Sequence, residues 1–474
     1  MSYSGRPSPS QERRQLAQSY QHEHRERARR RTERRGRSRT SAATQSGLQA
    51  IPAISAGNAS DTPAASMSVA PWESETGSSA TMSNAPAAAG SSGDRITLNK
   101  ILDGNNLLAT FDRLRHEKGQ APGTDGISYG DLTRSEIAAA LRQVAKHIHN
   151  GTYRPQPLRT CLIPKQHGGH RELRLLAVVD RIVAAAVEQD LAPLCEAEYL
   201  DNNFGFRRGR SVLGLLARLE AMIRRHGLHY MVELDIRDAF PSTSIAAAVA
   251  ECRALPIDAP VLDLIHKSIN PVSEVSGPSG LPQGNPLSPQ IFNLRLTRLL
   301  DRPFAAGSGD ALLLRYADNL VLAAGDISHV RSAQRRVAEL LAAGDYQLKT
   351  PAADPGDVRD PEDRMKILGY GVRYAQDQLT LHHGPESWQR LTDLFKEAHQ
   401  APHPGTTAQA SVLGWLLDQG PTVEGAQRQA WISQVRRLAA EQGFRELGRV
   451  EDLRQSLGGA DRWESARLRE SGGC

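Results

Sequence analysis

The pentapeptide Arg315-Tyr316-Ala317-Asp318-Asn319 lies between two apolar runs and constrains the fold more than any other part of the chain. The whole segment, 311–324, reads Ala-Leu-Leu-Leu-Arg-Tyr-Ala-Asp-Asn-Leu-Val-Leu-Ala-Ala. Short hydrophobic runs on both sides of an Asp-Asn pair are typical of a β-hairpin. A carboxylate at the tip of a hairpin points outward and can hold a divalent metal ion, so Asp318 is a candidate metal ligand.

A second segment, upstream, has the same character. Met231–Phe240 reads MVELDIRDAF, which predicts a strand that ends at Asp235. Two aspartates side by side make a two-metal site of the kind that carries out phosphoryl transfer. Each aspartate alone is more simply interpreted as a turn residue, because aspartate is common in turns. The metal interpretation therefore depends on finding Asp235 and Asp318 together.

The first 94 residues differ in composition from the rest of the chain. An arginine-rich run, 25–39, is followed by a tract of Ser, Ala, Gly, Pro and Thr that extends to about Asp94. Such a tract cannot bury enough apolar surface to offset the entropy lost on ordering, so we expect residues 1–94 to be disordered. Either a contact with nucleic-acid phosphates or a solvated arm would account for the arginines, and the formal net charge of +5 agrees with both.

Cysteine spacing and hydropathy favour a cytoplasmic protein. The cysteines form no CxxC pair, so neither a zinc site nor a disulfide framework is predicted. The chain has no apolar stretch of about 18 residues and no apolar N-terminal segment like that of a secretory signal. We therefore expect a cytoplasmic protein with no membrane span.

The order of the expected elements after residue 95 indicates an α+β protein. Prolines and a glycine turn within 153–179 predict a basic two-stranded finger, and Asp180 is a candidate N-cap of the helix that follows. Helices are expected on both sides of the strand at 230–235 and of the hairpin. A further strand is expected at Ile367–Tyr374, with only helices after about residue 384. This order favours helices packed around one sheet over a doubly wound sheet.

Several segments, in this order along the chain, resemble the bacterial reverse transcriptases of the group II intron and retron type. Each is a weak signal alone, and the resemblance covers about residues 100–375, with a weaker similarity beyond. The segments are Gly119–Gly126, Tyr153-Arg-Pro with Ile163-Pro-Lys165, Arg171 with Asp180-Arg181, Asn203–Ser211, Asp235–Phe240, Leu281–Gly284 with Leu287-Ser-Pro289, Tyr316–Asn319 and Leu368-Gly-Tyr370.

The resemblance implies a right-hand polymerase fold with fingers, an antiparallel-sheet palm and a short helical thumb. The matching ranges are 95–230 for the fingers, 231–375 for the palm, with a fingers segment at about 255–290, and 376–474 for the thumb-like region. Within the last range, Ser411–Leu417 resembles the family's thumb, and no CxxC-bearing endonuclease module follows. A full maturase with DNA-binding and nuclease domains is therefore not expected.

The resemblance also implies an activity: RNA-directed addition of dNTPs to a primer 3′-hydroxyl, with release of pyrophosphate. Asp235 and Asp318, assisted by Asn319, would hold two Mg²⁺ ions, or Mn²⁺ as an alternative, since these hard cations prefer oxygen ligands. The implied partners are an RNA template and a DNA or RNA primer, with a cognate structured non-coding RNA as a further candidate. A mobile element, a retron and antiviral defence all stay open as biological roles.

The remaining site residues are implied by the matching motifs. Lys165 and Arg171 would grip the triphosphate, where neutralising charge is the largest available catalytic contribution. Phe240 would place an aromatic ring beneath the incoming sugar and so disfavour a 2′-hydroxyl. The other implied contacts are the backbone amides of Asp238 and Ala239 to the phosphates, Gln283 and Gly284 as the floor of the nucleotide pocket, and Arg207, Arg208 and Arg210 to template or primer phosphates. The plainer interpretations are solvated surface charges for the basic residues and a core phenylalanine for Phe240.

The sequence departs from the family pattern at two residues near the expected site. The family motif ends in two aspartates, but the second is Asn319 here, whose amide oxygen can coordinate a metal without adding charge. We expect activity to persist, reduced or with an altered metal preference; the alternatives are an untemplated or defence-associated polymerase and a catalytically inactive RNA-binding protein. Lys349 is displaced from the place where the family often has a lysine that could protonate pyrophosphate, so it is assigned no role.

Overall fold

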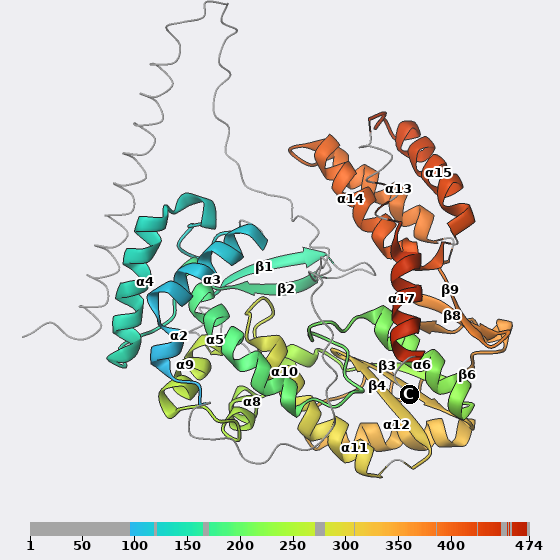
Figure 1. The fold of residues 1–474 in the computed structure, drawn as a ribbon, viewed down its shortest axis with the longest axis horizontal. Helices are drawn as coiled ribbons and strands as arrows, with labels where there is room; N and C mark the ends of the chain where they lie inside the picture. The colour runs from blue at the N-terminus through green and yellow to red at the C-terminus, as the bar shows by residue number, and fades with distance from the viewer. Residues whose placement is uncertain are drawn as a thin grey trace, which may run out of the picture. The chain divides into compact units, whose positions relative to one another are not determined.

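The computed structural model describes residues 95–117, 121–164, 170–270, 280–307, 309–384, 386–423, 425–446, 453, 455 and 457–471 (Figure 1). The expected disorder of residues 1–94 and the expected role of Lys165 lie outside these ranges. Helices and antiparallel sheets are mixed, which confirms the α+β prediction. Within the described ranges, no helix is both long and apolar enough to cross a membrane.

A four-stranded antiparallel sheet, which we call the central sheet, carries both aspartates of the candidate site. Its order is β4-β5-β3-β6, with β3 at Tyr230–Asp235, β4 at Ala311–Tyr316, β5 at Asn319–Ala324 and β6 at Gly356–Asp357. Successive side chains of β5 enter different cores: Leu320 and Leu322 pack in one, Val321 and Ala323 in the other. This is the period-two alternation of a strand that is covered on both faces.

One helix from each core covers a face of the central sheet. Helix α12 (Ile327–Ala342) belongs to the first core and α6 (Val212–His226) to the second. Both begin at side-chain caps, since the Asp326 carboxylate accepts from Ser328 N and Ser211 Oγ accepts from Gly214 N. Helix α6 ends at Gly227, whose φ of 65° is the left-handed conformation that glycine adopts readily.

The residues before the central sheet form a mainly helical part with one hairpin. The predicted finger is confirmed as the antiparallel pair β1 (Arg159–Pro164) and β2 (His170–Leu175). The helices here and in the segment between β3 and β4 are α2 (Leu98–Ile101), α3 (Gly104–Glu117), α4 (Arg134–His149), α5 (Val178–Glu198), α7 (Ala239–Ser242), α8 (Ile245–Cys252), α9 (Ala259–Ile269), α10 (Ser288–Leu296) and α11 (Arg302–Gly307).

The interpretation of Asp180 as an N-cap is wrong. Helix α5 begins earlier, at Val178, and its N-cap residue is Ala177, which makes no side-chain cap. Asp180 lies in the first turn instead, where its carboxylate accepts from Tyr153 Oη at 2.8 Å and from Gln156 N at 2.8 Å. The position of this carboxylate is therefore determined by contacts with the preceding extended segment. The local sequence pattern does not show these contacts.

A small sheet and a helical unit follow the central sheet. The expected single strand at Ile367–Tyr374 is wrong, because Leu368 and Gly369 have φ of 51° and 88° and form a turn between β7 and β8. The three strands are β7 (Lys366–Ile367), β8 (Tyr370–Ala375) and β9 (Gln378–His382). Helices α13 (Glu386–His399), α14 (Pro404–Gln419) and α15 (Arg428–Glu441) share a separate core, whereas α17 (Gly459–Ser471) packs through Trp463 into the core of α6.

Candidate active site

The pairing of β3 with β5 places Asp235 and Asp318 at the same end of the central sheet. Asp235 is the last residue of β3 and lies opposite Asn319, the first residue of β5. Ile236 N donates to the carbonyl oxygen of Asp318 at 3.1 Å. Asp318 itself lies in the two-residue turn between β4 and β5, which we call the 317–318 turn. Two segments far apart in the sequence thus present their aspartates next to each other.

The 317–318 turn is held in a strained conformation by a neighbouring loop. Ala317 has a φ of 57°, in the left-handed region that residues with a side chain seldom adopt. Gly205 lies against this turn, and a Cβ atom on Gly205 would be 2.2 Å from the backbone nitrogen of Ala317. Only glycine allows that approach. The loop 203–211 therefore packs directly against Ala317, the residue that precedes Asp318.

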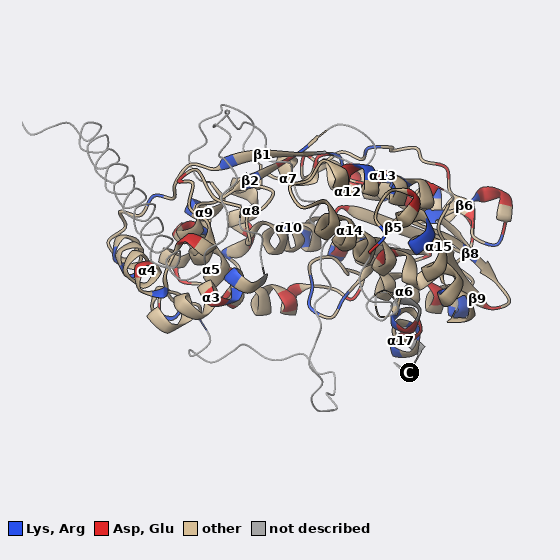
Figure 2. Ribbon diagram, turned by 90° about the horizontal axis from the view of Figure 1, so that it is seen from above, with Lys and Arg blue, Asp and Glu red and all other residues tan. Residues whose placement is uncertain are grey.

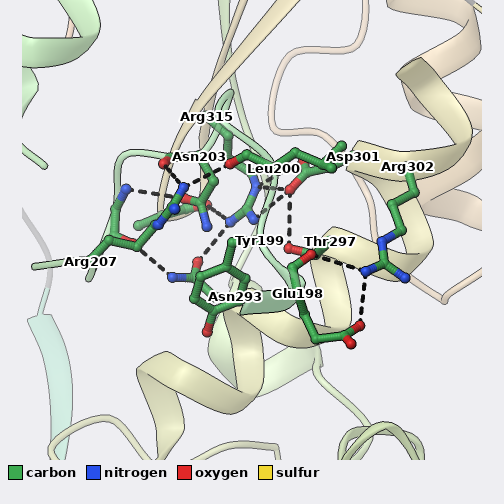
Figure 3. A network of polar contacts seen from close by, with 12 residues as sticks. Glu198, Tyr199, Leu200, Asn203, Arg207, Asn293, Thr297, Asp301, Arg302 and Arg315 are labelled. Atoms are coloured by element: carbon green, nitrogen blue, oxygen red, sulfur yellow. Dashed lines mark hydrogen bonds and ion pairs between the residues drawn. The ribbon is translucent and has the colours of Figure 1, made fainter. Parts of the chain in front are cut away.

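Arg315 lies beneath the 317–318 turn in a buried network of polar contacts (Figure 3). Its guanidinium group donates to Asp301 through Nε (3.1 Å to Oδ1) and Nη2 (2.7 Å to Oδ2), and both side chains are 0% exposed. Nη1 donates to Asn293 Oδ1 at 2.8 Å and to the carbonyl oxygen of Ala317 at 3.3 Å. The last contact links the buried pair to the strained residue next to Asp318.

The same network extends to the loop 203–211. Asn293 Nδ2 donates to the Gly205 carbonyl at 2.7 Å, and Phe204 N donates to the Arg315 carbonyl at 2.7 Å. Asp301 is the last residue of a π-helical turn, η2 (Thr297–Asp301), a wide helical geometry that often occurs at functional sites. The sequence analysis missed these roles, although an arginine inside an apolar strand is a signal of a buried ion pair.

Lys349 is a further residue that the sequence analysis left without a role. Its Nζ lies 2.6 Å from Asp235 Oδ2, and its backbone N donates to the Asp235 carbonyl at 2.8 Å. The segment after α12 therefore runs beside the end of β3 and brings a cation to the aspartate pair. The motif spacing could not show this, because the contact depends on the path of the chain after α12.

The electrostatics of the aspartate pair fit a divalent cation. Burial raises the pKa of Asp318, and the negative charge of Asp235 raises it further, while Lys349 and Arg171 oppose the shift. Asp235 Oδ1 is buried and has no hydrogen-bond partner among the described residues. A buried oxygen without a donor, beside a second carboxylate, suits a hard cation such as Mg²⁺. Within the described ranges, no cluster of three or more His, Cys, Asp or Glu side chains that could bind a metal occurs.

Phe240 follows β3 on the short helix α7, five residues after Asp235 in the sequence. Its ring is half-buried and stacks on the buried ring of Phe292, with centroids 4.7 Å apart and an interplanar angle of 25°. Leu281 N donates to the Phe240 carbonyl at 2.9 Å, which joins α7 to the Leu281–Gly284 loop. Asp238 precedes the helix with a φ of 43°, and the side chain of Ala239 is buried.

The loop with Gln283 and Gly284 is joined to the finger hairpin. Arg174 N, on β2, donates to the Gln283 carbonyl at 2.7 Å. Gly284 has a φ of 104°, and a Cβ atom there would lie 3.2 Å from the Arg174 carbonyl oxygen. Arg171 lies on the same strand with an exposed side chain, and its charge acts on Asp318. The loop with Gln283 and Gly284 is thus joined to β2, the strand that also carries Arg171.

The three arginines of the loop 203–211 differ in their surroundings. Arg207 has a side chain that is 5% exposed; it pairs with Glu196 and donates to the carbonyls of Leu200 and Asn203. Arg210 pairs with Asp201 at 2.8 Å, and Arg208 is exposed. Lys and Arg are interspersed with Asp and Glu over the described elements rather than gathered in one part (Figure 2). Any nucleic-acid contact would therefore depend on individual residues and not on one basic patch. Of the three arginines, Arg207 has the least exposed side chain.

A known protein family matches the part of the chain that contains this site, and individual proteins are similar over a part of comparable length. The family described as reverse transcriptase (RNA-dependent DNA polymerase) matches residues 163–353. Protein YkfC from Escherichia coli (strain K12) is 27% identical over 191 residues, which are 39% of this chain and 50% of that protein. The group II intron-encoded protein LtrA from Lactococcus lactis subsp. cremoris is 27% identical over 195 residues, 40% of this chain and 32% of that protein.

A solved structure is similar at a lower level. Apo telomerase from Candida tropicalis has a TM-score of 0.40 and 11% sequence identity, with 70% of this chain and 71% of that chain covered. The chain spans half or less of the length of the two relatives named above. The family match covers the hairpin, the two aspartates and Lys349, and it confirms the resemblance inferred from the motifs.

Proposed function

We propose, from the premise that residues 163–353 belong to the reverse transcriptase family, that this chain is an RNA-directed DNA polymerase. It would add dNTPs to a primer 3′-hydroxyl, with an RNA template and a DNA or RNA primer as partners. The observation that carries the proposal is the pairing of Asp235 with Asn319, which sets two aspartates side by side at the end of the central sheet. That arrangement is what two-metal phosphoryl transfer requires.

Asp235 and Asp318 would hold two divalent ions, Mg²⁺ by preference, and the amide oxygen of Asn319 would assist. When bound, the ions supply activation of the primer hydroxyl and neutralisation of charge on the triphosphate. Burial and the charge of Asp235 raise the pKa of Asp318, and a cation between the two carboxylates would offset both effects. Oδ1 of Asp235, which has no hydrogen-bond partner among the described residues, is available to such a cation.

Basic residues around the pair would act on the triphosphate. Lys349 Nζ lies 2.6 Å from Asp235 Oδ2, so this side chain is placed to neutralise the site and to act as a proton donor to the leaving pyrophosphate. Arg171, and Lys165 on the other side of the finger turn, would bind the phosphate oxygens. Arg208 and Arg210 are our candidates for template or primer phosphates, whereas Arg207 contributes by fixing the loop.

The pocket for the nucleotide would lie between α7 and the Leu281–Gly284 loop. Phe240 would lie under the sugar, and its ring would collide with a 2′-hydroxyl. The backbone at Asp238 and Ala239 would approach the phosphates from one side, with Gln283 and Gly284 as the floor. The bond from Leu281 N to the Phe240 carbonyl keeps these parts together.

Primer extension tests this proposal. The full chain, a primed RNA template, dNTPs and Mg²⁺ or Mn²⁺ should give extension, and Asp235→Asn and Asp318→Asn should each lower it by about a thousandfold. Asp310→Asn is the matched control, because Asp310 is exposed and precedes β4 at the end away from the 317–318 turn. No extension by the unaltered chain with either metal would contradict the proposal, and product sequencing separates templated from untemplated synthesis.

A second candidate function is RNA binding without catalysis. Asn319 favours it, because the site has one negative charge fewer than the family motif. This candidate predicts that the chain binds primed RNA with the same affinity before and after Asp318→Asn, and that no variant at position 319 extends the primer.

A further inference from the structure

We propose that Phe206 is a specificity-determining residue: it positions Phe240, and through that ring it sets the preference for deoxynucleotides over ribonucleotides. The inference rests on the polymerase function proposed above and adds to it a residue that does not belong to the aspartate pair or to the nucleotide pocket described so far.

Two features of Phe206 are unfavourable for an ordinary surface residue. Its side chain is large and apolar, yet the residue is 45% exposed. Its φ is 54°, which is a left-handed backbone for a bulky residue. Backbone strain of this kind persists where the surrounding structure imposes it, and it concentrates at functional sites. The backbone that presents the exposed ring is therefore held in this conformation by its neighbours.

The contacts that impose this conformation come from both sides of Phe206. On one side, Gly205 is fixed against the backbone of Ala317 and accepts from Asn293 Nδ2. On the other side, the Arg207 guanidinium group is bound to Glu196. The carbonyl oxygen of Phe206 itself accepts from Gln290 Nε2 at 3.3 Å. These contacts fix the backbone on both sides of Phe206, and those of Gly205 also support the 317–318 turn.

The Phe206 ring contacts the ring of Phe240. The Phe206 and Phe240 centroids are 6.2 Å apart with an interplanar angle of 88°, an edge-to-face contact. Phe292, which is 0% exposed, stacks on Phe240 as well. Phe240 therefore lies against a core ring and a ring supplied by the loop. Of these two supports, only Phe206 can be removed without opening the core.

The Phe240 ring can exclude a 2′-hydroxyl only if the ring cannot move away from that hydroxyl. Rejection by shape depends on placement to within a fraction of an ångström, and small displacements have large kinetic effects. Without the Phe206 ring, Phe240 would have open space where it now has an aromatic edge. We expect ribonucleotides to gain access, so discrimination should fall because NTP addition rises.

Steady-state kinetics of single-nucleotide addition test this inference. The quantity measured is the ratio of kcat/KM for a dNTP to kcat/KM for the matching NTP, in which a general loss of folded protein cancels. Phe206→Ala and Phe206→Gly should lower the ratio about five- to tenfold, the range expected for one lost aromatic contact. Phe206→Tyr keeps the edge of the ring and should stay within about twofold of the unaltered chain.

The two truncations and a control separate the ring from the backbone. Phe206→Gly removes the ring and also relieves the left-handed strain, so its thermal unfolding temperature should not fall. Ile327→Ala is the matched control. Ile327 is 37% exposed and is the first residue of α12. It therefore follows the end of β5 that is farther from the 317–318 turn. Its ratio should be unchanged.

The contrary results are distinct. If the unaltered chain discriminates and both truncations keep the same ratio, the inference about Phe206 is overturned while the polymerase function stands. A fall in Phe206→Ala that is absent in Phe206→Gly would also overturn it, since backbone strain and not the ring would be responsible. If the unaltered chain adds no nucleotide, the proposed function fails and the inference fails with it.

Discussion

At the scale of the residue, Asn319 decides how much negative charge the candidate site offers a cation. It lies opposite Asp235 in the sheet register and next to Asp318 in the sequence. An amide oxygen at this place can bind a metal, but it brings no charge, and the charge of the ligand set tunes affinity for hard cations. Compared with the second aspartate of the family motif, Asn319 should therefore weaken metal binding without removing the site.

Restoring the carboxylate should strengthen the binding of metal at the site. For Asn319→Asp we expect the Mg²⁺ concentration that gives half-maximal extension to fall about three- to tenfold. The measurement is the extension rate on a primed RNA template as a function of Mg²⁺. Asn105→Asp, at an exposed position in α3, makes the same change in net charge and should leave the curve unmoved. If only Asn319→Asp extends the primer and the unaltered chain does not, the chain is not an active polymerase.

Asp180 makes the stability of the fold depend on pH. Burial raises the pKa of this carboxyl to about 6, against the lowering effects of the bonds from Gln156 N and Tyr153 Oη. Because the folded chain then holds a proton that the unfolded chain has lost, the free energy of unfolding should fall as pH rises from about 4 to about 6, by about 3 kcal/mol. Above that range this group should cause no further change.

Urea denaturation at a series of pH values measures this effect, with Asp180→Asn as the comparison. The asparagine cannot ionise, so the difference in free energy of unfolding between the two chains should shift in favour of the variant between pH 4 and 6. A difference that stays constant over this window would show that the carboxyl is not protonated in the folded state.

At the scale of the element, the hairpin that carries Asp318 could be predicted from the sequence, but the buried contacts that support it could not. The apolar runs around Asp318 determine two paired strands, because alternation and turn residues are local properties. The buried contacts among Arg315, Asp301 and Asn293 join three separate segments, and one sequence does not show which polar residues will meet in a core. The same limit explains Lys349, whose contact with Asp235 depends on the chain after α12.

The Arg315 pair should stabilise the elements around the 317–318 turn only as a complete unit. Arg315→Met leaves the carboxylate of Asp301 buried without its cation, and we expect the free energy of unfolding to fall by about 3–5 kcal/mol. Asp301→Leu combined with Arg315→Met removes both charges and should recover part of this loss. Urea unfolding compares the two. A double variant that is less stable than Arg315→Met would contradict the assignment of the pair.

At the scale of the whole described chain, sequence order predicted the class of fold but not how its C-terminal part returns to the central sheet. Helices after residue 384 were expected, and they occur as α13, α14, α15 and α17. That α17 packs against α6 could not be predicted, because its sequence is largely polar. The contact includes a buried carboxylate, Glu220, and only two α17 residues in the shared core, Trp463 and Ala466, among the described residues. Contacts of this kind join distant segments and leave no periodic pattern in the sequence.

Glu220 is the point at which α6, β9 and α17 meet. The residue is 2% exposed, and its carboxylate accepts from Arg467 Nε at 2.7 Å, from Arg467 Nη2 at 2.8 Å and from Leu379 N at 3.1 Å. Arg224, one turn along α6, donates to it at 3.1 Å. A buried carboxylate costs stability unless its donors are all in place, so the return of α17 supplies a bidentate partner that the other two elements cannot.

Removing that partner should therefore loosen the C-terminal helix from the central sheet. For Arg467→Met we expect the free energy of unfolding to fall by about 2–3 kcal/mol, since Glu220 keeps only its bonds from Arg224 and Leu379. Arg469→Met is the matched control, because Arg469 is exposed on the same helix, and it should change stability by less than about 0.5 kcal/mol. Urea unfolding gives both values, and limited proteolysis should cut within α17 sooner in Arg467→Met than in the control. Equal cutting rates in the two variants would mean that α17 is held by Trp463 and its apolar neighbours alone, and that the buried ion pair is not what fixes the C-terminal part to the sheet.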